Sequence, residues 1–171
     1  GKAITPVSGG FFKIESNNGL KITDSRNRVS TITATDIQAS NGVVHLVDRV
    51  LRPADKDIVA TASALPDFSI LVEAVVAAGL ASTLQGTGPF TVFAPTNAAF
   101  AALLTELGVS KADLLANTAL LTKVLTYHVV PARVLKAEVP VNTAITTVLG
   151  QSFTVNSSLV ITDQNMRTSS I

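Results

Sequence analysis

The sequence predicts an α+β fold, because strand-like segments form both ends of the chain and helix-like segments form its middle. Residues 1–53 alternate β-branched segments with turns that contain glycine or asparagine. Residues 57–127 carry apolar side chains at helical spacing, and the strand-like pattern returns after His128. Hydrophobic residues make up 47% of the 171 positions and charged residues only 15%, which provides enough apolar surface for a buried core.

The first part of the chain is expected to contain five strands. They are rich in β-branched residues, and each is bounded by a polar turn. The predicted strands are Ala3–Val7, Phe11–Glu15, Leu20–Thr23, Val29–Thr35 and Val43–Val50. A short polar hinge, Arg52–Lys56, separates them from the helical part.

Capping residues mark the starts of five expected helices. These residues are Asp57 or Thr61, Asp67, Thr96, Ser110 and Asn117. Asp113 stands three residues after Ser110, which is the spacing of a capping box. Gly79 is expected to end the second helix, because glycine adopts the backbone conformation that terminates helices.

Further strands are expected among and after these helices, at Phe90–Phe93, Val129–Val130, Ala144–Val148, Ser152–Val155 and Leu159–Thr162. The aromatic and aliphatic residues around the first of them are predicted to lie in the core: Phe90, Val92, Phe93 and Phe100.

The two ends of the chain repeat one another. AITPVSGGFFKI at residues 3–14 matches AITTVLGQSFTV at 144–155, and LKITDSRNRVSTI at 20–32 matches LVITDQNMRTSSI at 159–171. Matching apolar positions are kept, as two copies of the same strands would require, and the first copy carries two extra residues near Asn17–Gly19, where a hairpin tip tolerates insertion.

Four segments resemble the motifs of the fasciclin domain family. TVFAPTNAAF at 91–100 is similar to the first signature of the family, and NGVVHLVDRVLRP at 41–53 to the second. DIVATASALPDFSILVEAVVAAGL resembles its opening helices, and LTYHVVP its central tyrosine–histidine segment. The resemblance implies a wedge of two β-sheets with several helices packed on one side.

The order of these motifs departs from the family pattern, because the second signature comes first. We therefore expect residues 1–53 to be the C-terminal strand portion of one fasciclin-like domain and residues 57–171 the N-terminal and central portion of another. Residues 32–50 of the same or a neighbouring chain are expected to complete the second portion. A closed, permuted monomer and a swapped dimer or polymer both satisfy this expectation, and the surplus hairpin favours assembly.

The composition gives little support for catalysis or for nucleic-acid binding. The net charge is +1 without any run of Lys or Arg, and there is no cysteine. Only two histidines are present, His45 and His128, and neither lies in a metal-binding or nucleophile motif, so a structural hydrogen bond is the expected role of each. No catalytic residue, metal site or cofactor is predicted, and no segment is long and apolar enough to span a membrane.

The resemblance implies a candidate partner-binding segment at Tyr127 and His128, flanked by Leu125, Val129 and Val130. The competing interpretation is that these side chains are core, because the segment passes from a helix to a strand. We expect a non-enzymatic adhesion or structural module, secreted, periplasmic or on the cell surface, that contacts a protein or matrix partner and self-associates. The alternative is a carrier of an apolar small molecule such as a carotenoid, in a cavity between sheet and helices.

Overall fold

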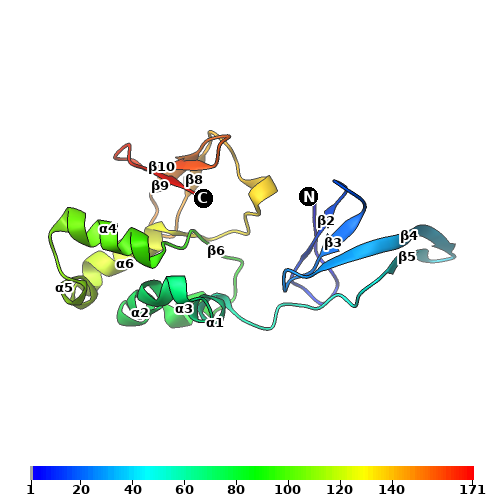
Figure 1. The fold of residues 1–171 in the computed structure, drawn as a ribbon, viewed down its shortest axis with the longest axis horizontal. Coiled ribbons are helices and arrows are strands. Elements are labelled where there is room, and N and C mark those ends of the chain that lie inside the picture. The colour runs from blue at the N-terminus through cyan, green and yellow to red at the C-terminus, as the bar shows by residue number, and fades with distance from the viewer. Residues whose placement is uncertain (1) are drawn as a thin grey trace. The chain divides into compact units, whose positions relative to one another are not determined.

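The computed structural model describes residues 2–171, which form two compact units. The first unit extends to Asp55 and consists of strands, and the second unit, Lys56–Ile171, contains all the helices of the described chain as well as strands (Figure 1). The predicted α+β class is confirmed, with several antiparallel sheets beside the helices.

The first unit is one antiparallel sheet of five strands in chain order. The strands are β1 Lys2–Ile4, β2 Phe12–Glu15, β3 Lys21–Thr23, β4 Val29–Ala39 and β5 Gly42–Val47. The β4–β5 hairpin changes register twice, and Asp36, at a positive φ of 60°, lies at one of these irregularities. The Asp36 N–H donates to His45 Nδ1 across the hairpin at 3.2 Å, so His45 has a structural hydrogen bond, as its sequence context predicts.

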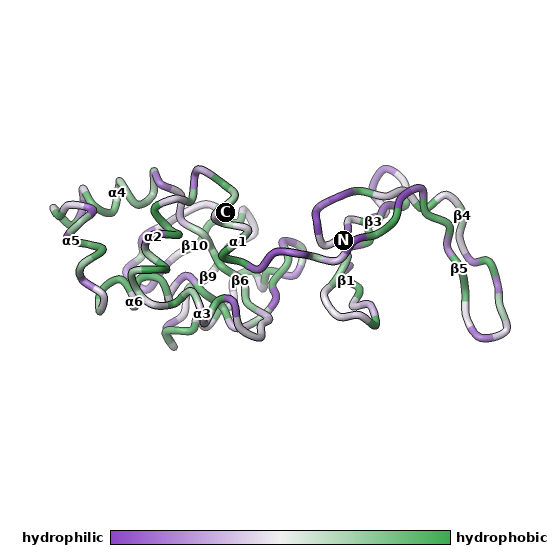
Figure 2. Tube along the Cα trace, turned by 90° about the horizontal axis from the view of Figure 1, so that it is seen from below, coloured by the Kyte–Doolittle hydropathy of each residue, from purple (hydrophilic) through white to green (hydrophobic). Residues whose placement is uncertain are grey.

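Apolar side chains of the β4–β5 hairpin are exposed rather than packed. Ile37 on β4 and four residues of β5, namely Val43, Val44, Leu46 and Val47, have large exposed fractions. Figure 2 shows β5 as a hydrophobic stretch that follows a polar turn. The hairpin therefore presents an apolar surface, whereas the buried residues of this unit are Ile22 on β3, Asp24 directly after β3 and Ser30 at the start of β4.

The helices of the second unit begin mostly where the capping residues predict. They are α1 Ile58–Ser63, η1 Pro66–Phe68, α2 Ser69–Ala77, α3 Ala81–Leu84, α4 Asn97–Leu107, α5 Lys111–Ala116, α6 Thr118–Tyr127 and η2 Lys136–Glu138. Asp57, Thr96 and Asn117 accept hydrogen bonds from the first turns of α1, α4 and α6, and Ser110 forms the predicted capping box with Asp113.

The expectation that Asp67 caps the second helix is wrong. Asp67 lies inside the short 3₁₀ helix η1, because Pro66 fixes the backbone there in a tight turn. The amide of Ile70 at the start of α2 is instead bound by the side chain of Asn97, whose Oδ1 accepts at 3.0 Å. A residue of α4, distant in sequence, thus satisfies the end of α2.

The strands of the second unit form two small sheets. β6 Thr91–Val92 pairs with β7 Val129–Val130, and a four-stranded sheet has the order β11-β10-β9-β8. Its strands are β8 Ala144–Thr146, β9 Ser152–Val155, β10 Val160–Thr162 and β11 Thr168–Ser170. Within residues 2–171, β11 pairs with β10 alone and so forms an edge of this sheet.

The second unit has two clusters of buried apolar residues. The larger joins α2, α4, α5 and α6 around Phe100 and Leu121, and the smaller surrounds Val155 and Phe153 on β9. Phe100 is buried, as predicted from the sequence. The other three predicted core residues, Phe90, Val92 and Phe93, are only partly buried and pack against the edges of these clusters.

The repeated segments adopt the same register in both units. Ile4 lies opposite Phe12 on β1 and β2, and Ile145 lies opposite Phe153 on β8 and β9. The pairs Ile22–Ser30 and Ile161–Ser169 correspond in the same way. Each sequence repeat therefore coincides with a repeat of strand pairing, in which β2, β3 and the start of β4 correspond to β9, β10 and β11.

Candidate functional site

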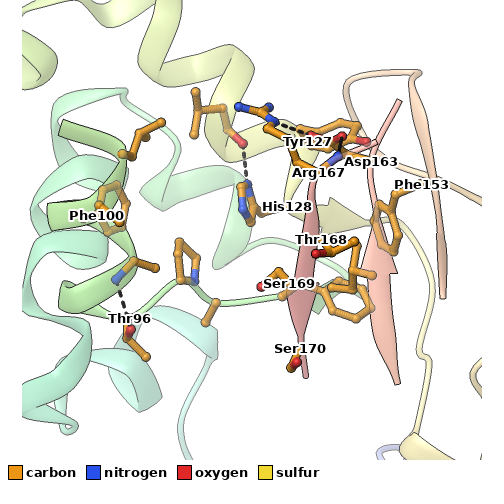
Figure 3. A pocket seen from close by; sticks show the side chains of 18 of the residues that line it. Thr96, Phe100, Tyr127, His128, Phe153, Asp163, Arg167, Thr168, Ser169 and Ser170 are labelled. Atoms are coloured by element: carbon orange, nitrogen blue, oxygen red, sulfur yellow. Dashed lines mark hydrogen bonds and ion pairs between the residues drawn. The ribbon is translucent and has the colours of Figure 1, made fainter. Parts of the chain in front are cut away.

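An apolar groove of about 660 Å³ lies in the second unit. Three phenylalanines, Phe93, Phe100 and Phe153, contribute to its lining. Figure 3 shows Thr96 and Phe100 on the helical side, the strand that carries Thr168–Ser170 on the opposite side, and His128 between them. The edge strand β11 thus forms one wall of the groove, and its backbone is open to pairing along that side.

Tyr127 and His128 line this groove at the end of α6. The Tyr127 hydroxyl donates to the carbonyl of Ser152 at 3.1 Å, and its ring makes an edge contact with Phe153 at 6.1 Å. Burial first, and then the negative charge of Asp163, raises the pKa of Tyr127 above its usual value. The phenol is therefore neutral at physiological pH and serves as a hydrogen-bond donor.

His128 is held by its own helix. Its Nδ1 lies 2.7 Å from the carbonyl oxygen of Val124, and because a carbonyl only accepts, Nδ1 carries the proton and donates. The rings of Tyr127 and His128 are nearly perpendicular, at 87°, with centroids 6.3 Å apart. This arrangement orients the imidazole beside the groove and matches the structural hydrogen bond expected from the sequence.

The three flanking residues of the candidate segment do not line the groove. Leu125, Val129 and Val130 are all buried in the apolar clusters. Their side chains contribute to packing and position Tyr127 and His128 between α6 and β7. A direct contact with a partner at this segment consequently depends on Tyr127 and His128, which are partly exposed.

A carboxylate–guanidinium pair, Asp163 with Arg167, completes the groove at its β10–β11 end. Asp163 accepts from the backbone N–H groups of Asn165 and Arg167 at 2.8 and 2.9 Å, and from Arg167 Nε at 2.8 Å. Burial opposes ionisation of Asp163, but these donors outweigh burial and hold its pKa below the usual range. Arg167 also reaches Glu106 on α4, with 3.3 Å between Nη1 and Oε1.

Sequence reasoning missed Asp163, Arg167 and Ser169 as site residues. A signal for them was present, because the repeat keeps each one: Asp24, Arg28 and Ser30 stand at the matching positions of the first copy. Identical polar residues at two copies of a turn indicate a shared hydrogen-bonding role.

The described residues offer no cluster of metal ligands. Across residues 2–171 no three His, Asp or Glu side chains gather in a way that could hold a metal ion. In the same part of the chain, the hydrogen bonds of both histidines run to backbone groups.

The fold and the motifs define a domain of the fasciclin type. The sequence pattern of the fasciclin domain matches residues 1–53 and 66–170, and the chain belongs to this family. Fasciclin domains are generally non-catalytic adhesion modules.

Several curated proteins are similar to parts of the chain. Protein sll1483 of Synechocystis sp. is 52% identical over 83 residues, covering 48% of this chain and 45% of that protein. Transforming growth factor-beta-induced protein ig-h3 of Sus scrofa is 41% identical over 100 residues, covering 58% of this chain and 14% of that protein. The chain thus spans less than half the length of either relative.

A solved structure shares the fold. The FAS1 domain pair of the insect cell adhesion molecule Fasciclin I superposes with a TM-score of 0.57 at 16% identity, covering 92% of this chain and 59% of that chain. In the described part of this chain, every helix is too short or too polar to cross a bilayer.

Proposed function

We propose that this chain is a non-enzymatic extracytoplasmic module that acts through protein–protein or matrix contacts made at the groove of its second unit. The observation that carries this proposal is the combination of an apolar groove with an open strand edge, Thr168–Ser170, along one wall. An apolar recess beside an unpaired backbone suits a protein ligand that adds a strand and buries side chains. Tyr127 and His128 supply polar groups at the same groove.

The similar proteins also support an adhesive role. One solved relative is described as a cell adhesion molecule, and the family is one of adhesion modules. We place the chain by analogy in a secreted, periplasmic or cell-surface setting. Self-association belongs to this proposal, because the two units are interpreted as portions of fasciclin-like domains, residues 1–53 and 57–171, that strand exchange with residues 32–50 would complete.

Retention of the chain on immobilised matrix proteins tests the proposal. The probes are collagen, fibronectin and laminin surfaces, with an albumin surface as reference. Wild-type chain is expected to bind at least one matrix surface more strongly than albumin, and Tyr127→Ala is expected to reduce that binding because it removes an aromatic side chain from the groove.

Val76→Ala is the matched control, because Val76 is exposed on α2 and does not line the groove. It should bind like the wild type, and circular dichroism of both variants verifies that they are folded. Equal retention of the wild type on matrix proteins and on albumin would contradict the proposed function.

The volume of the groove favours one second candidate, a carrier of an apolar small molecule. Ligand pockets have volumes of roughly 300–1,000 Å³, and the 660 Å³ groove with its three phenylalanines falls within that range. A visible absorption band of a carotenoid that remains with the chain through gel filtration, and disappears in Phe100→Ala or Phe153→Ala, would favour this function over adhesion.

A further inference from the structure

Residues 50–56, called here the connecting segment, lead from the first unit into the second. The start of this segment is bound to the first unit. Arg28 Nη2 donates to the carbonyl of Val50 at 3.0 Å, and the Arg52 N–H donates to Asp24 Oδ2 at 2.9 Å. Because Asp24 is buried, and buried polar groups keep their hydrogen-bond partners, this contact fixes the backbone at Arg52.

The side chain of Arg26 holds the next part of the connecting segment. Its Nε donates to the carbonyl of Pro53 at 3.0 Å, and its Nη2 forms an ion pair with Asp55 Oδ2 at 2.8 Å. One guanidinium thus binds two residues of the segment, which the rigid fork of arginine permits. The Arg26 side chain is 25% exposed, so water screens this ion pair less than it screens a fully exposed one.

The turn that carries Arg26 gives this side chain a fixed base. The Arg26 N–H donates to Asp24 Oδ1 at 2.9 Å. The buried carboxylate of Asp24 therefore binds the backbone of Arg26 through one oxygen and the backbone of Arg52 through the other. The residue that holds the connecting segment and the segment itself are anchored to the same group.

The second hairpin has the same turn without this arginine. Asn165 occupies the position of Arg26 in the repeat, and its N–H donates to Asp163 Oδ1 at 2.8 Å, as the Arg26 N–H does to Asp24. The turn thus forms with either residue. The contacts that the Arg26 side chain makes with the connecting segment are additional to those that form the turn.

The second unit holds the chain from Asp57 onward. The Ala60 N–H donates to Asp57 Oδ1 at 2.7 Å, and Thr61 donates to the Asp57 carbonyl from its N–H at 2.9 Å and from its Oγ1 at 2.7 Å. Asp55, the last residue of the first unit, is bound by its ion pair. Lys56 is thus the one residue between the last anchor of the first unit and the first anchor of the second.

We infer that Arg26 clamps the connecting segment and so confines the joint between the two units to Lys56. The hinge that the sequence suggests, Arg52–Lys56, is thereby shortened to the rotatable bonds around one residue. One residue spans at most about 3.6 Å, so the joint allows rotation and adds little separation. A short joint lowers the entropy that is lost when a partner holds both units at once. This inference goes beyond the proposed function and does not depend on the groove.

Backbone dynamics of the intact chain, measured by ¹⁵N relaxation, test the inference. In the wild type we expect order parameters of roughly 0.85 at Ala54 and Asp55, as in rigid backbone, and a lower value at Lys56. Arg26→Asn introduces the residue of the second hairpin, so it removes the clamp and keeps the turn. In this variant the order parameters of Ala54 and Asp55 should fall below about 0.6.

A lysine-specific protease gives a second measure, because Lys56 is exposed. Cleavage of a folded chain follows the fraction of molecules in which the segment around the cut is released. We expect cleavage after Lys56 to be several times faster in Arg26→Asn than in the wild type. The substitution itself adds and removes no lysine.

Lys13→Gln is the matched control, since Lys13 also forms an ion pair within the first unit, with Glu15 at 2.8 Å. It should leave the order parameters of the connecting segment and its cleavage rate at the wild-type values. The amide shifts of β2 and β3 in the same spectra verify that the first unit of each variant is folded. Wild-type order parameters at Ala54 and Asp55 as low as at Lys56, or values that Arg26→Asn leaves unchanged, would overturn the inference.

Discussion

The two repeated hairpins carry corresponding Asp–Arg ion pairs that differ in what covers them. Asp24 and Asp163 share their turn geometry and their arginine partner, but only Asp24 receives a further backbone N–H, from Arg52. At Asp24, burial alone would raise the pKa of the carboxyl, yet the N–H groups of Arg52 and Arg28 and the Arg28 guanidinium outweigh it and hold the pKa far below its usual range. The comparison shows that the same turn motif forms more hydrogen bonds where a neighbouring segment, here Val50–Arg52, lies on it.

The largest expected difference is in the stability cost of losing each carboxylate. Asp24→Ala should cost about 3–5 kcal/mol of the free energy of unfolding of the first unit, because it leaves a guanidinium and several backbone N–H groups without their acceptor in a buried site. Asp163→Ala should cost the second unit about 1 kcal/mol, because the Asp163–Arg167 ion pair is more open to water.

Urea unfolding separates the two units, since the single tyrosine, Tyr127, lies in the second and its fluorescence reports only on that unit. Far-ultraviolet circular dichroism follows the whole chain, so a transition that appears in the circular dichroism and not in the tyrosine fluorescence is assigned to the first unit. Equal losses in the two variants would show that the contacts of Val50 and Arg52 with the first ion pair add no stability.

A second prediction separates the core of the second unit from the wall of the groove. Phe100→Ala should reduce the free energy of unfolding by about 3–5 kcal/mol, because its side chain is buried against the helices. Phe93→Ala should cost about 2 kcal/mol or less, because Phe93 is partly exposed and contacts Phe153 mainly edge-on, with ring centroids 5.1 Å apart.

The same fluorescence-detected unfolding measures both phenylalanine variants. A Phe93→Ala loss as large as that of Phe100→Ala would mean that the groove is part of the closed core rather than a binding surface.

A third prediction concerns the loss of folding stability at acid pH. The folded pKa values of Asp24 and Asp163 are both depressed, so each carboxylate contributes stability that is present above its unfolded pKa of about 3.9 and is lost as pH falls towards its folded value. Urea midpoints measured from about pH 6 down to pH 2 should therefore fall for the wild type. Asp24→Asn should flatten this dependence in the first unit, and a slope unchanged by the substitution would refute the assignment.

Local signals allowed much of the fold to be predicted from the sequence. The caps at Asp57, Thr96, Ser110 and Asn117 act within one helical turn, so their residue types and spacing identify them. The cap of α2 could not be predicted in this way, because Asn97 is 27 residues from Ile70. The local sequence suggests Asp67 as the cap, but a tertiary contact with Asn97 takes that role.

The candidate site was predicted only in part for a similar reason. Tyr127 and His128 were named from a motif and do line the groove, whereas the burial of Leu125, Val129 and Val130 depends on the packing of α6 and β7 against distant strands. Their role in partner binding stays a prediction. Asp163 and Arg167 repeat Asp24 and Arg28 in the sequence, but their hydrogen bonds depend on the conformation of the turn, which the repeated residue types alone do not give.

The most direct test of the account is the binding of one peptide, VHLVDRVLRP, which corresponds to residues 44–53. Titration calorimetry of this peptide into the intact chain should show saturable binding of one peptide per chain. Asp163→Asn should weaken that binding about tenfold or more, and Asp24→Asn should not weaken it, because the groove contains only the second carboxylate. Absence of binding, or binding that Asp163→Asn leaves unchanged, would contradict the proposal that strand exchange occurs at the groove beside β11.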